Sequence, residues 1–404
     1  MSQTKRNNSG GGCGSTPLVL IFLLLGGGWW LAGQFNWQAL LPKFWPDNLP
    51  WVGEIGSSPD IKPPLKNSIE TKEQTSIPND SPHLETTHSS PKIEIPLKNS
   101  IDRKEQASIR GIYLSRYQAT NNANEQKIRQ RVRDYRDWGF NTIIHGVWGN
   151  GCTMYKSKVT AKYVGYDSCP NQFQEQWIEW LIDEAEKQGM EIHAYFEKGI
   201  KIDENSPLFD IAVEQRWIVA GVDRTYQNVD HYVLDISIPE VAALLTDVLV
   251  EFVQKYPTID AAHWDDYLGY HAELPGNVDR GKKLTEFVQK MITAMKQTNS
   301  NVSFDITHHN PYWAKTHFAA DWQRWNIDRA FIQAYAEDNF EDEMQYVHQH
   351  DGIAITEKQF VHLPVLLSDK EVGNILVFPL SGESEAVAVA YSQLITKLKQ
   401  QREN

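Results

Sequence analysis

From Arg110 onward, short apolar segments of strand length alternate with amphipathic segments of helical length. In Glu125–Trp138, for example, Ile128, Val132 and Tyr135 fall on one helical face, and Gly139 follows as a stop signal. Such alternation over about 295 residues is typical of a parallel sheet, because each parallel strand needs a long crossover before the next one.

The pattern predicts eight strands. They are Gly111–Leu114, Asn141–Val147, Glu191–Phe196, Ile259–Ala262, Val302–Thr307, Ala330–Tyr335, Gly352–Thr356 and Asn374–Phe378. Further helices are predicted at Phe173–Gln188, Pro239–Tyr256 and Leu284–Met295. Eight strands with intervening helices fit a (β/α)8 TIM barrel of class α/β at residues 109–404, with a doubly wound open sheet as the alternative. The crossover after Gly352–Thr356 is too short for a full helix.

Three segments precede this domain. Residues 1–16 are polar and contain Lys5 and Arg6 but no acid, and residues 17–37 carry no charge. We expect residues 17–37 to be a transmembrane anchor with the 1–16 tail in the cytoplasm, or alternatively a cleaved signal peptide. In either case the rest of the chain is extracytoplasmic, in the periplasm or at the cell surface, and a cleaved chain would be secreted.

Residues 38–108 have the composition of a disordered linker, rich in proline, serine, threonine and lysine. Within this region, Ile61–Ile77 and Ile93–Ile109 agree at 12 of 17 positions. Two polar copies are too few for a solenoid, so we interpret them as a duplicated piece of linker.

Charge is unevenly distributed. Residues 1–109 contain ten basic and ten acidic residues, so the net charge of −13 comes from the 29 basic and 42 acidic residues that follow. An acidic domain of this size argues against nucleic acid as a partner, because phosphate binding needs the opposite sign. The 14 tryptophans and 16 tyrosines suit either stacking on sugar rings or an aromatic core.

The segment Ile259–Tyr267 (IDAAHWDDY) marks the predicted active site. An apolar strand ends there in two adjacent carboxylates, Asp265 and Asp266, which repel one another and tend to raise one pKa. In a barrel, reacting groups lie at the carboxyl ends of the strands, and Glu197 follows another strand in the same way. We predict Asp265 as one catalytic carboxylate, with Asp266 or Glu197 as the second; a solvated Asp pair and a Glu197–Lys198 ion pair are the structural alternatives.

Other strand ends supply polar and aromatic side chains that suit a sugar. The predicted substrate-binding residues are His145, Trp148, Tyr195, Trp264, Tyr267, His308, Asn310, Gln333 and Tyr335. His145 is equally compatible with a hydrogen-bonded barrel histidine. No metal or other cofactor is predicted, because adjacent histidines on a strand point to opposite faces and cannot easily share an ion. Cys152 and Cys169 lie in one loop and form either a disulfide or two free thiols.

Several segments together resemble the bacterial glycosyl hydrolase-like "family 10-like" barrels that are common in cyanobacteria. They are RGIYL at 110–114, FNTIIHGVWGNG at 140–151, TMYKS at 153–157, AYFEKG at 194–199, LDISIPEV at 234–241 and HWDDY at 263–267, with fainter likeness at 321–335. The resemblance implies a barrel that acts on a polysaccharide, with Asp265, Asp266 and Glu197 in its cleft. We therefore expect a membrane-tethered glycoside hydrolase of an envelope or extracellular polysaccharide; the alternative is an inactive glycan-binding barrel that serves as an envelope scaffold.

Overall fold

The computed structural model describes residues 108–115, 123–170, 173–224, 230–270, 274–276 and 278–403. The predicted tail (1–16), the anchor (17–37) and the linker (38–108), apart from its last residue, lie outside these ranges. Within the described part, no helix combines the length and the apolar composition that crossing a membrane requires.

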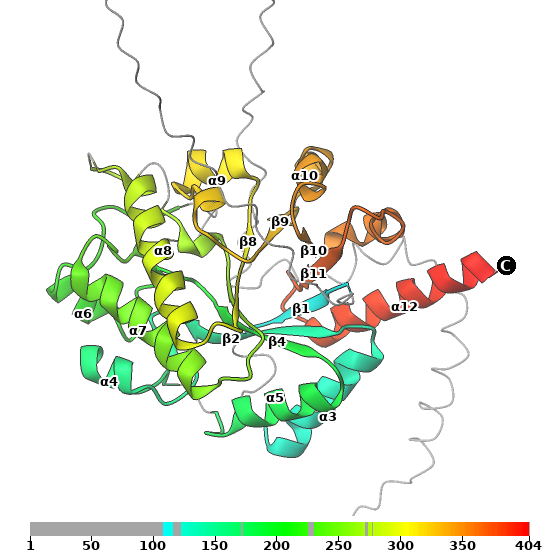
Figure 1. Cartoon of the computed structure of the whole chain (residues 1–404), viewed down its shortest axis with the longest axis horizontal. Helices are drawn as coiled ribbons and strands as arrows, with labels where there is room; N and C mark the ends of the chain where they lie inside the picture. Colours follow the sequence, from blue (N-terminus) through cyan, green and yellow to red (C-terminus); the bar gives the residue numbers. More distant parts are fainter. Residues whose placement is uncertain are drawn as a thin grey trace, which may run out of the picture. The chain divides into compact units, whose positions relative to one another are not determined.

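Eight parallel strands form a closed TIM barrel with helices around it (Figure 1). β1 (Arg110–Leu114) pairs with β2 (Thr142–Gly149) on one side and with β11 (Asn374–Phe378) on the other, which closes the ring. The strands between them are β4 (Glu191–Phe196), β7 (Ala261–Trp264), β8 (Ser303–His308), β9 (Arg329–Gln333) and β10 (Gly352–Thr356). The predicted barrel is thus confirmed and the open-sheet alternative is wrong.

The predicted helices are present with small shifts of their ends. The crossovers contain α3 (Glu125–Asp137), α5 (Trp177–Lys187), α7 (Pro239–Lys255), α8 (Arg280–Thr298), α9 (Pro311–Phe318), α10 (Phe340–Val347) and the closing helix α12 (Ser384–Glu403). After β10, only the 3-10 helix η5 (Glu357–His362) and the four-residue α11 (Leu363–Leu366) intervene before β11, so this crossover is short, as predicted.

The long segment between β2 and α5 contains β3 (Cys152–Thr153) and α4 (Lys158–Val164). Between β4 and α7 the chain forms a small insertion of β5 (Lys201–Ile202), α6 (Phe209–Glu214) and β6 (Tyr232–Val233), in which β5 and β6 pair antiparallel. The 3-10 helices η2 (Asp266–Leu268), η3 (Trp322–Arg324) and η4 (Glu337–Asn339) complete the described elements. β2, β4 and β7 each end beside one of these extra segments.

Asparagine and aspartate side chains join the strands at the amino end of the barrel. Each precedes or begins a strand and accepts the backbone N–H of an adjacent strand at 2.7–2.8 Å; the pairs are Asn141 with Arg110, Asp260 with Ile192, Asp328 with Phe304, Asp351 with Ala330, and Asn374 with Ile109. These bonds satisfy backbone N–H groups that would otherwise lack a hydrogen-bond acceptor at the strand starts. They tie down the end opposite to the candidate site.

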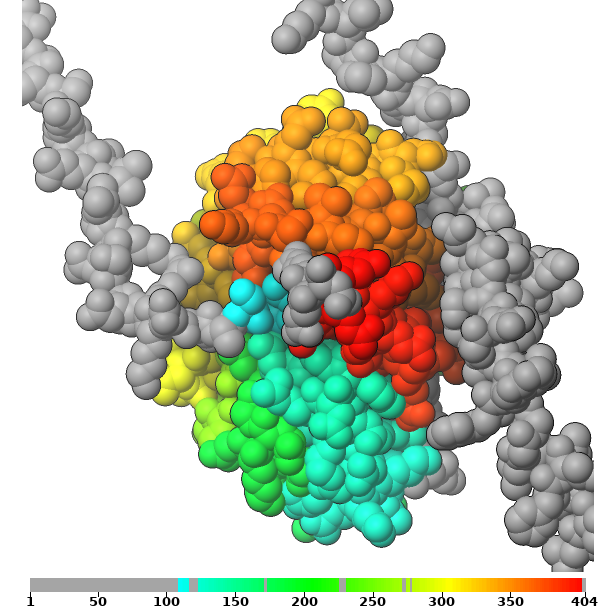
Figure 2. Space-filling model, turned by 90° about the vertical axis from the view of Figure 1, so that its right-hand side faces the viewer, coloured from blue at the N-terminus to red at the C-terminus, as the bar shows by residue number. Residues whose placement is uncertain are grey.

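The last helix closes the barrel against the first repeat. Tyr391 of α12 stacks on Phe140 with ring centroids 4.6 Å apart, and Tyr135 of α3 donates a hydrogen bond to Ser384 Oγ at 3.0 Å. Figure 2 shows the same relationship at the surface, where the red carboxyl-terminal segment lies between the cyan first repeat and the orange segment before it.

Candidate active site

Asp265 and Asp266 follow directly on β7, whose four residues are all buried. Asp265 begins the 3-10 helix η2: its Oδ1 accepts the N–H of Tyr267 at 3.0 Å. This cap turns the chain sharply at the end of the strand, as Asp does at a helix start. Only 9% of Asp265 and 3% of Asp266 is exposed, so the solvated Asp pair that was the structural alternative is not what the fold contains.

The two carboxylates have different partners. The Tyr195 hydroxyl donates a hydrogen bond to Oδ2 of Asp265. Burial and then the charge of Asp266 raise the pKa of Asp265 well above its usual value, which favours the protonated acid. Asp266 faces Nε2 of His309 at 3.5 Å. Burial alone would raise the pKa of Asp266, but the hydrogen bond and charge of His309 outweigh it and lower the pKa to about 2.

Glu197 lies one residue beyond β4 and is half-buried. Its Oε2 is buried and has no hydrogen-bond partner among the described residues. An unsatisfied buried carboxylate oxygen points to a group that meets something outside the chain. The predicted alternative for Glu197 is wrong, because the neighbouring Lys198 pairs with Asp203 at 2.5 Å.

The turn that carries Glu197 is fixed directly to η2. Ile200 N donates to the carbonyl of Tyr267 at 3.1 Å. Gly199 has a φ of 45°, and a Cβ there would lie 2.6 Å from the Tyr267 carbonyl oxygen, so only glycine allows this approach. The backbone therefore holds Glu197 and the Asp pair in one arrangement, although they are almost 70 residues apart in the sequence.

A buried ion pair lies behind Asp266. Lys201 and Asp223 are both fully buried, with Nζ and Oδ2 3.0 Å apart. The Lys201 ammonium also lies 5.0 Å from the ring centre of Tyr267 and 5.5 Å from that of Phe318. The sequence offered no signal for this pair, because its two members are 22 positions apart and are joined only through the β5–β6 insertion.

Of the predicted substrate-binding residues, four are buried in the protein interior. Trp148 and Trp264 are 1% and 0% exposed, so neither can stack on a sugar. Trp264 of β7 stacks on Phe196 of β4, with ring centroids 4.5 Å apart. The indole N–H of Trp148 donates a hydrogen bond to the Gly199 carbonyl at 3.1 Å. A register shift between Gly146 and Trp148 marks an irregularity in β2 just before this residue.

His145 and His308, the two histidines predicted to bind substrate, are also buried and pack against aromatic rings outside the barrel. His145 donates from Nδ1 to the Gly146 carbonyl at 2.9 Å and lies 4.7 Å from the ring of Trp177 in α5. Its substrate role is therefore corrected to a core role, which was the alternative. His308 packs against Phe318 and is 1% exposed. Because β8 ends at His308, it is His309, the next residue, that turns toward Asp266.

The remaining predicted residues lie at the carboxyl ends of their strands. Tyr195 holds Asp265, and Tyr267 follows the Asp pair. Tyr335 is half-buried and stacks on Phe378 with centroids 5.5 Å apart. Gln333 is buried with its Oε1 lacking a partner among the described residues, and Asn310 caps α9 by accepting the N–H of Trp313 at 3.0 Å.

A polar column that the sequence did not predict fills the barrel below the site. Tyr113 hydroxyl lies 2.7 Å from His263 Nε2 and 2.5 Å from Thr307 Oγ1. Further down, Arg329 donates to Oδ2 of Asp305 from two nitrogens, at 2.7 and 2.9 Å. These residues alternate on strands that are buried on both faces, where no polar–apolar pattern distinguishes inward from outward positions.

Two groups of side chains among the described residues have the spacing of metal ligands. The first consists of His193, His263 and Asp305 in the barrel interior, and the second of His348, Asp369 and Glu371 at the surface. In the first group the carboxylate is already bound by Arg329.

Cys152 and Cys169 form a disulfide. Tyr166, in the loop that it closes, donates to the Gly151 carbonyl at 2.7 Å. Asn150, two residues before Cys152, accepts the N–H of Asp203 in the insertion at 2.7 Å. The disulfide therefore closes a loop that begins directly after the residues in contact with the insertion.

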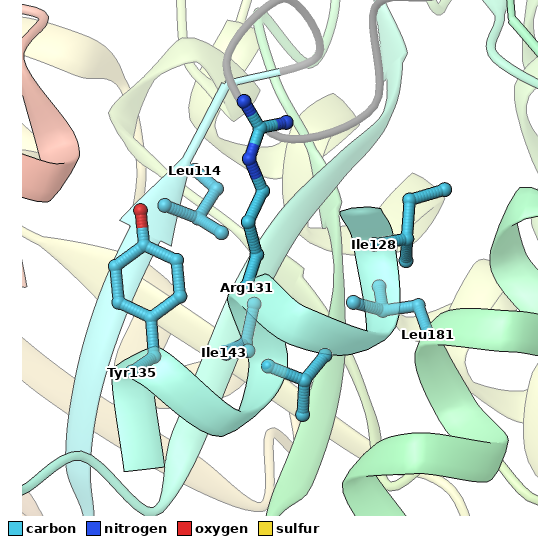
Figure 3. A pocket seen from close by; sticks show the side chains of 7 residues that line it. Leu114, Ile128, Arg131, Tyr135, Ile143 and Leu181 are labelled. Atoms are coloured by element: carbon cyan, nitrogen blue, oxygen red, sulfur yellow. The ribbon is translucent and has the colours of Figure 1, made fainter. Parts of the chain in front are cut away.

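A small apolar cavity lies elsewhere, between α3, α5 and strands β1 and β2 (Figure 3). Its lining consists of Leu114, Ile128, Arg131, Val132, Tyr135, Ile143 and Leu181. Apart from Arg131 and the Tyr135 hydroxyl, the lining offers no polar group, so we regard it as a packing defect rather than a substrate site.

Comparison with known proteins gives a family match in the first part of the barrel. Residues 108–278 match the family Glycosyl hydrolase-like 10. The resemblance drawn from the sequence motifs is confirmed over this range. The match runs from β1 past η2, so Glu197, Asp265 and Asp266 all fall within the glycosyl hydrolase-like region, while β8, α9 and everything after them fall outside.

Glycosyl hydrolase DigH of Escherichia coli (strain K12) is 28% identical over 193 residues, which cover 42% of this chain and 40% of that protein. Glycosyl hydrolase DigH of Shigella flexneri matches to the same extent. The chain thus spans about two fifths of the length of these curated relatives.

Among solved structures, a variant of the GH36 alpha-galactosidase AgaA from Geobacillus stearothermophilus has a TM-score of 0.45 at 12% identity, covering 74% of this chain and 42% of that one. The alpha-galactosidase from Lactobacillus brevis has a TM-score of 0.43 at 14% identity, covering 73% of this chain and 41% of that one. These likenesses concern the fold.

Proposed function

We propose that this chain is a glycoside hydrolase that cleaves a cell-envelope or extracellular polysaccharide. The observation that carries the proposal is the pair Asp265 and Asp266 at the end of β7. Burial and the charge of Asp266 raise the pKa of Asp265, whereas the His309 imidazole, 3.5 Å from Asp266, helps to lower the pKa of Asp266 to about 2. These two buried neighbouring carboxyls therefore favour opposite protonation states. Glycoside cleavage needs this combination of one acid and one carboxylate.

In this mechanism Asp265 protonates the leaving glycosidic oxygen, because its raised pKa favours the protonated carboxyl that a general acid needs. Asp266 is the ionised carboxylate that acts as nucleophile or base, and His309 keeps it charged. Glu197, with its unsatisfied Oε2, is the alternative to Asp266. The Glycosyl hydrolase-like 10 match over all three positions supports this assignment.

We further propose that the barrel works outside the cytoplasm, tethered to the membrane by residues 17–37 through the linker at 38–108. The uncharged segment, the basic residues before it and the linker composition support the tether. The disulfide between Cys152 and Cys169 supports an oxidising compartment, where such bonds persist.

The test is reducing-end release from purified cell-wall glycan and extracellular polysaccharide by the full chain. Asp265→Asn and Glu197→Gln are compared with Asp260→Asn, a matched control at the amino end of the same strand that can keep its bond to Ile192 N. We expect release by wild type and Asp260→Asn, and a loss of about 100-fold or more in Asp265→Asn. Undiminished release by Asp265→Asn would remove it from the mechanism. Glycan binding without any release would favour the inactive scaffold instead.

A further inference from the structure

α9 presents an exposed tyrosine at the barrel mouth. Tyr312 is 68% exposed, and no other tryptophan, tyrosine or phenylalanine in the described ranges is exposed to a comparable degree. It lies in the first turn of α9, which follows β8 after only two residues, His309 and Asn310. Its position three residues beyond His309 places it within about 11 Å of that residue along the chain. The backbone of Tyr312 therefore lies close to the residue that faces Asp266.

The helix that carries Tyr312 is held rigidly at both ends. At its start, Asn310 accepts the N–H of Trp313 at 3.0 Å and donates to Oε1 of Glu343 at 2.9 Å. At its end, the Phe318 carbonyl accepts the N–H of Tyr270 at 2.9 Å, which joins α9 to the segment that follows η2. The exposed ring thus projects from a fixed backbone, so binding it does not require ordering a loop.

Ring contacts also connect α9 with Asp266, one of the candidate catalytic carboxylates, through His309. His309, which faces Asp266, has its ring centre 6.3 Å from that of Trp313. Trp313 in turn lies 4.0 Å from the ring of His317. Trp313 and His317 are four apart within α9, which puts them on one side of the helix, and His309 lies just before its start. The half-buried Trp313 follows the exposed Tyr312 in the sequence, so two aromatic side chains lie in the first turn of α9.

We propose that Tyr312 and Trp313 form a carbohydrate-binding subsite, in which the rings stack on the apolar face of a pyranose ring adjacent to the bond cleaved at Asp265. This inference rests on the proposed function. Tyrosine and tryptophan combine a large flat apolar face with a polar edge, which suits a sugar ring that has the same two characters. The buried Trp148 and Trp264 cannot serve in this way. α9 lies beyond residues 108–278, so the subsite belongs to the part of the barrel that the family model does not describe, where substrate preference can differ.

The test measures glycan binding by the full chain in an Asp265→Asn background, by co-sedimentation with insoluble cell-wall glycan and by affinity electrophoresis in gels that contain the extracellular polysaccharide. Tyr312→Ala and Trp313→Ala are compared with Tyr312→Phe, which keeps the ring. Tyr163→Ala is the matched control, since α4 lies far from α9 (Figure 1). Near-ultraviolet circular dichroism checks that each variant is folded.

We expect Tyr312→Ala to weaken binding about tenfold, as the loss of one stacked ring predicts, while Tyr312→Phe and Tyr163→Ala bind like the parent. Equal binding by Tyr312→Ala, Trp313→Ala and the parent would overturn the subsite and leave the hydrolase proposal intact. Equal weakening by Tyr163→Ala would also overturn it. A parent that binds neither glycan, together with a wild type that cleaves neither, would instead refute the proposed function and this inference with it.

Discussion

The hydroxyl of Tyr195 donates a hydrogen bond to Oδ2 of Asp265, across the 70 positions that separate β4 from the end of β7. Burial and the charge of Asp266 raise the pKa of Asp265, whereas this hydrogen bond lowers it. Tyr195 therefore stabilises the ionised form of the residue that we propose as the proton donor.

Tyr195→Phe should raise the pKa of Asp265 further, because the bond to the ionised form is lost. The basic limb of the kcat/KM profile then moves to higher pH. Tyr166→Phe, which removes a hydroxyl bonded to the Gly151 carbonyl, is the control and should leave that limb in place. A shift to lower pH in Tyr195→Phe would contradict the role given to this bond.

His309→Phe should instead change the acid limb of the kcat/KM profile. His309 lowers the pKa of Asp266 to about 2, so its removal raises that pKa and Asp266 becomes protonated at a higher pH. The acid limb of the kcat/KM profile should therefore move to higher pH. His348→Gln, at the surface, is the control and should leave this limb in place. An unchanged acid limb would mean that Asp266 does not titrate in the mechanism.

Lys201→Met should destabilise the fold strongly. It removes the cation that faces Asp223 in a fully buried pair, and breaking such a pair costs about 3–5 kcal/mol of unfolding free energy. Urea unfolding of Lys201→Met, Asp223→Leu and the double variant measures this. We expect the double variant to be more stable than either single variant; if the losses simply add, the pair is not coupled.

The disulfide should contribute about 3 kcal/mol, since it closes a loop across 17 positions. Cys152→Ser with Cys169→Ser should lower the melting temperature, and a reductant should do the same to wild type but not to the double variant. Cys13→Ser leaves this bond intact and is the control. Equal melting temperatures of the double variant and wild type would show that the disulfide does not contribute to the stability of the fold.

Acidification should unfold the barrel partly through His145. Burial lowers its pKa from 6.5 to about 4, so between these values the unfolded chain binds a proton that the folded chain does not. The contribution is fully present above pH 6.5 and is lost as the pH falls to about 4. His145→Gln should therefore show a shallower decline of unfolding free energy between pH 7 and pH 5 than wild type. His231 and His308 contribute to the remaining decline of the unfolding free energy, because burial lowers their pKa values to about 4 and about 3.

The sequence by itself determined the barrel, because strand-length apolar runs, amphipathic helices and their stop signals are local features that repeat along the chain. It also located Asp265, Asp266 and Glu197 at one mouth, since every parallel strand of a barrel ends on the same side. These predictions needed only the order of elements, not their contacts.

Only the tertiary structure decided which side chains face the mouth. His145, Trp148 and Trp264 sit on or beside strands that are buried on both faces, so hydrophobicity gave no sign of their direction. The groups that contact Asp265 and Asp266, namely Tyr195 of β4 and His309 directly after β8, come from two other repeats of the barrel. Contacts between distant positions arise from barrel closure, and a linear pattern does not encode them.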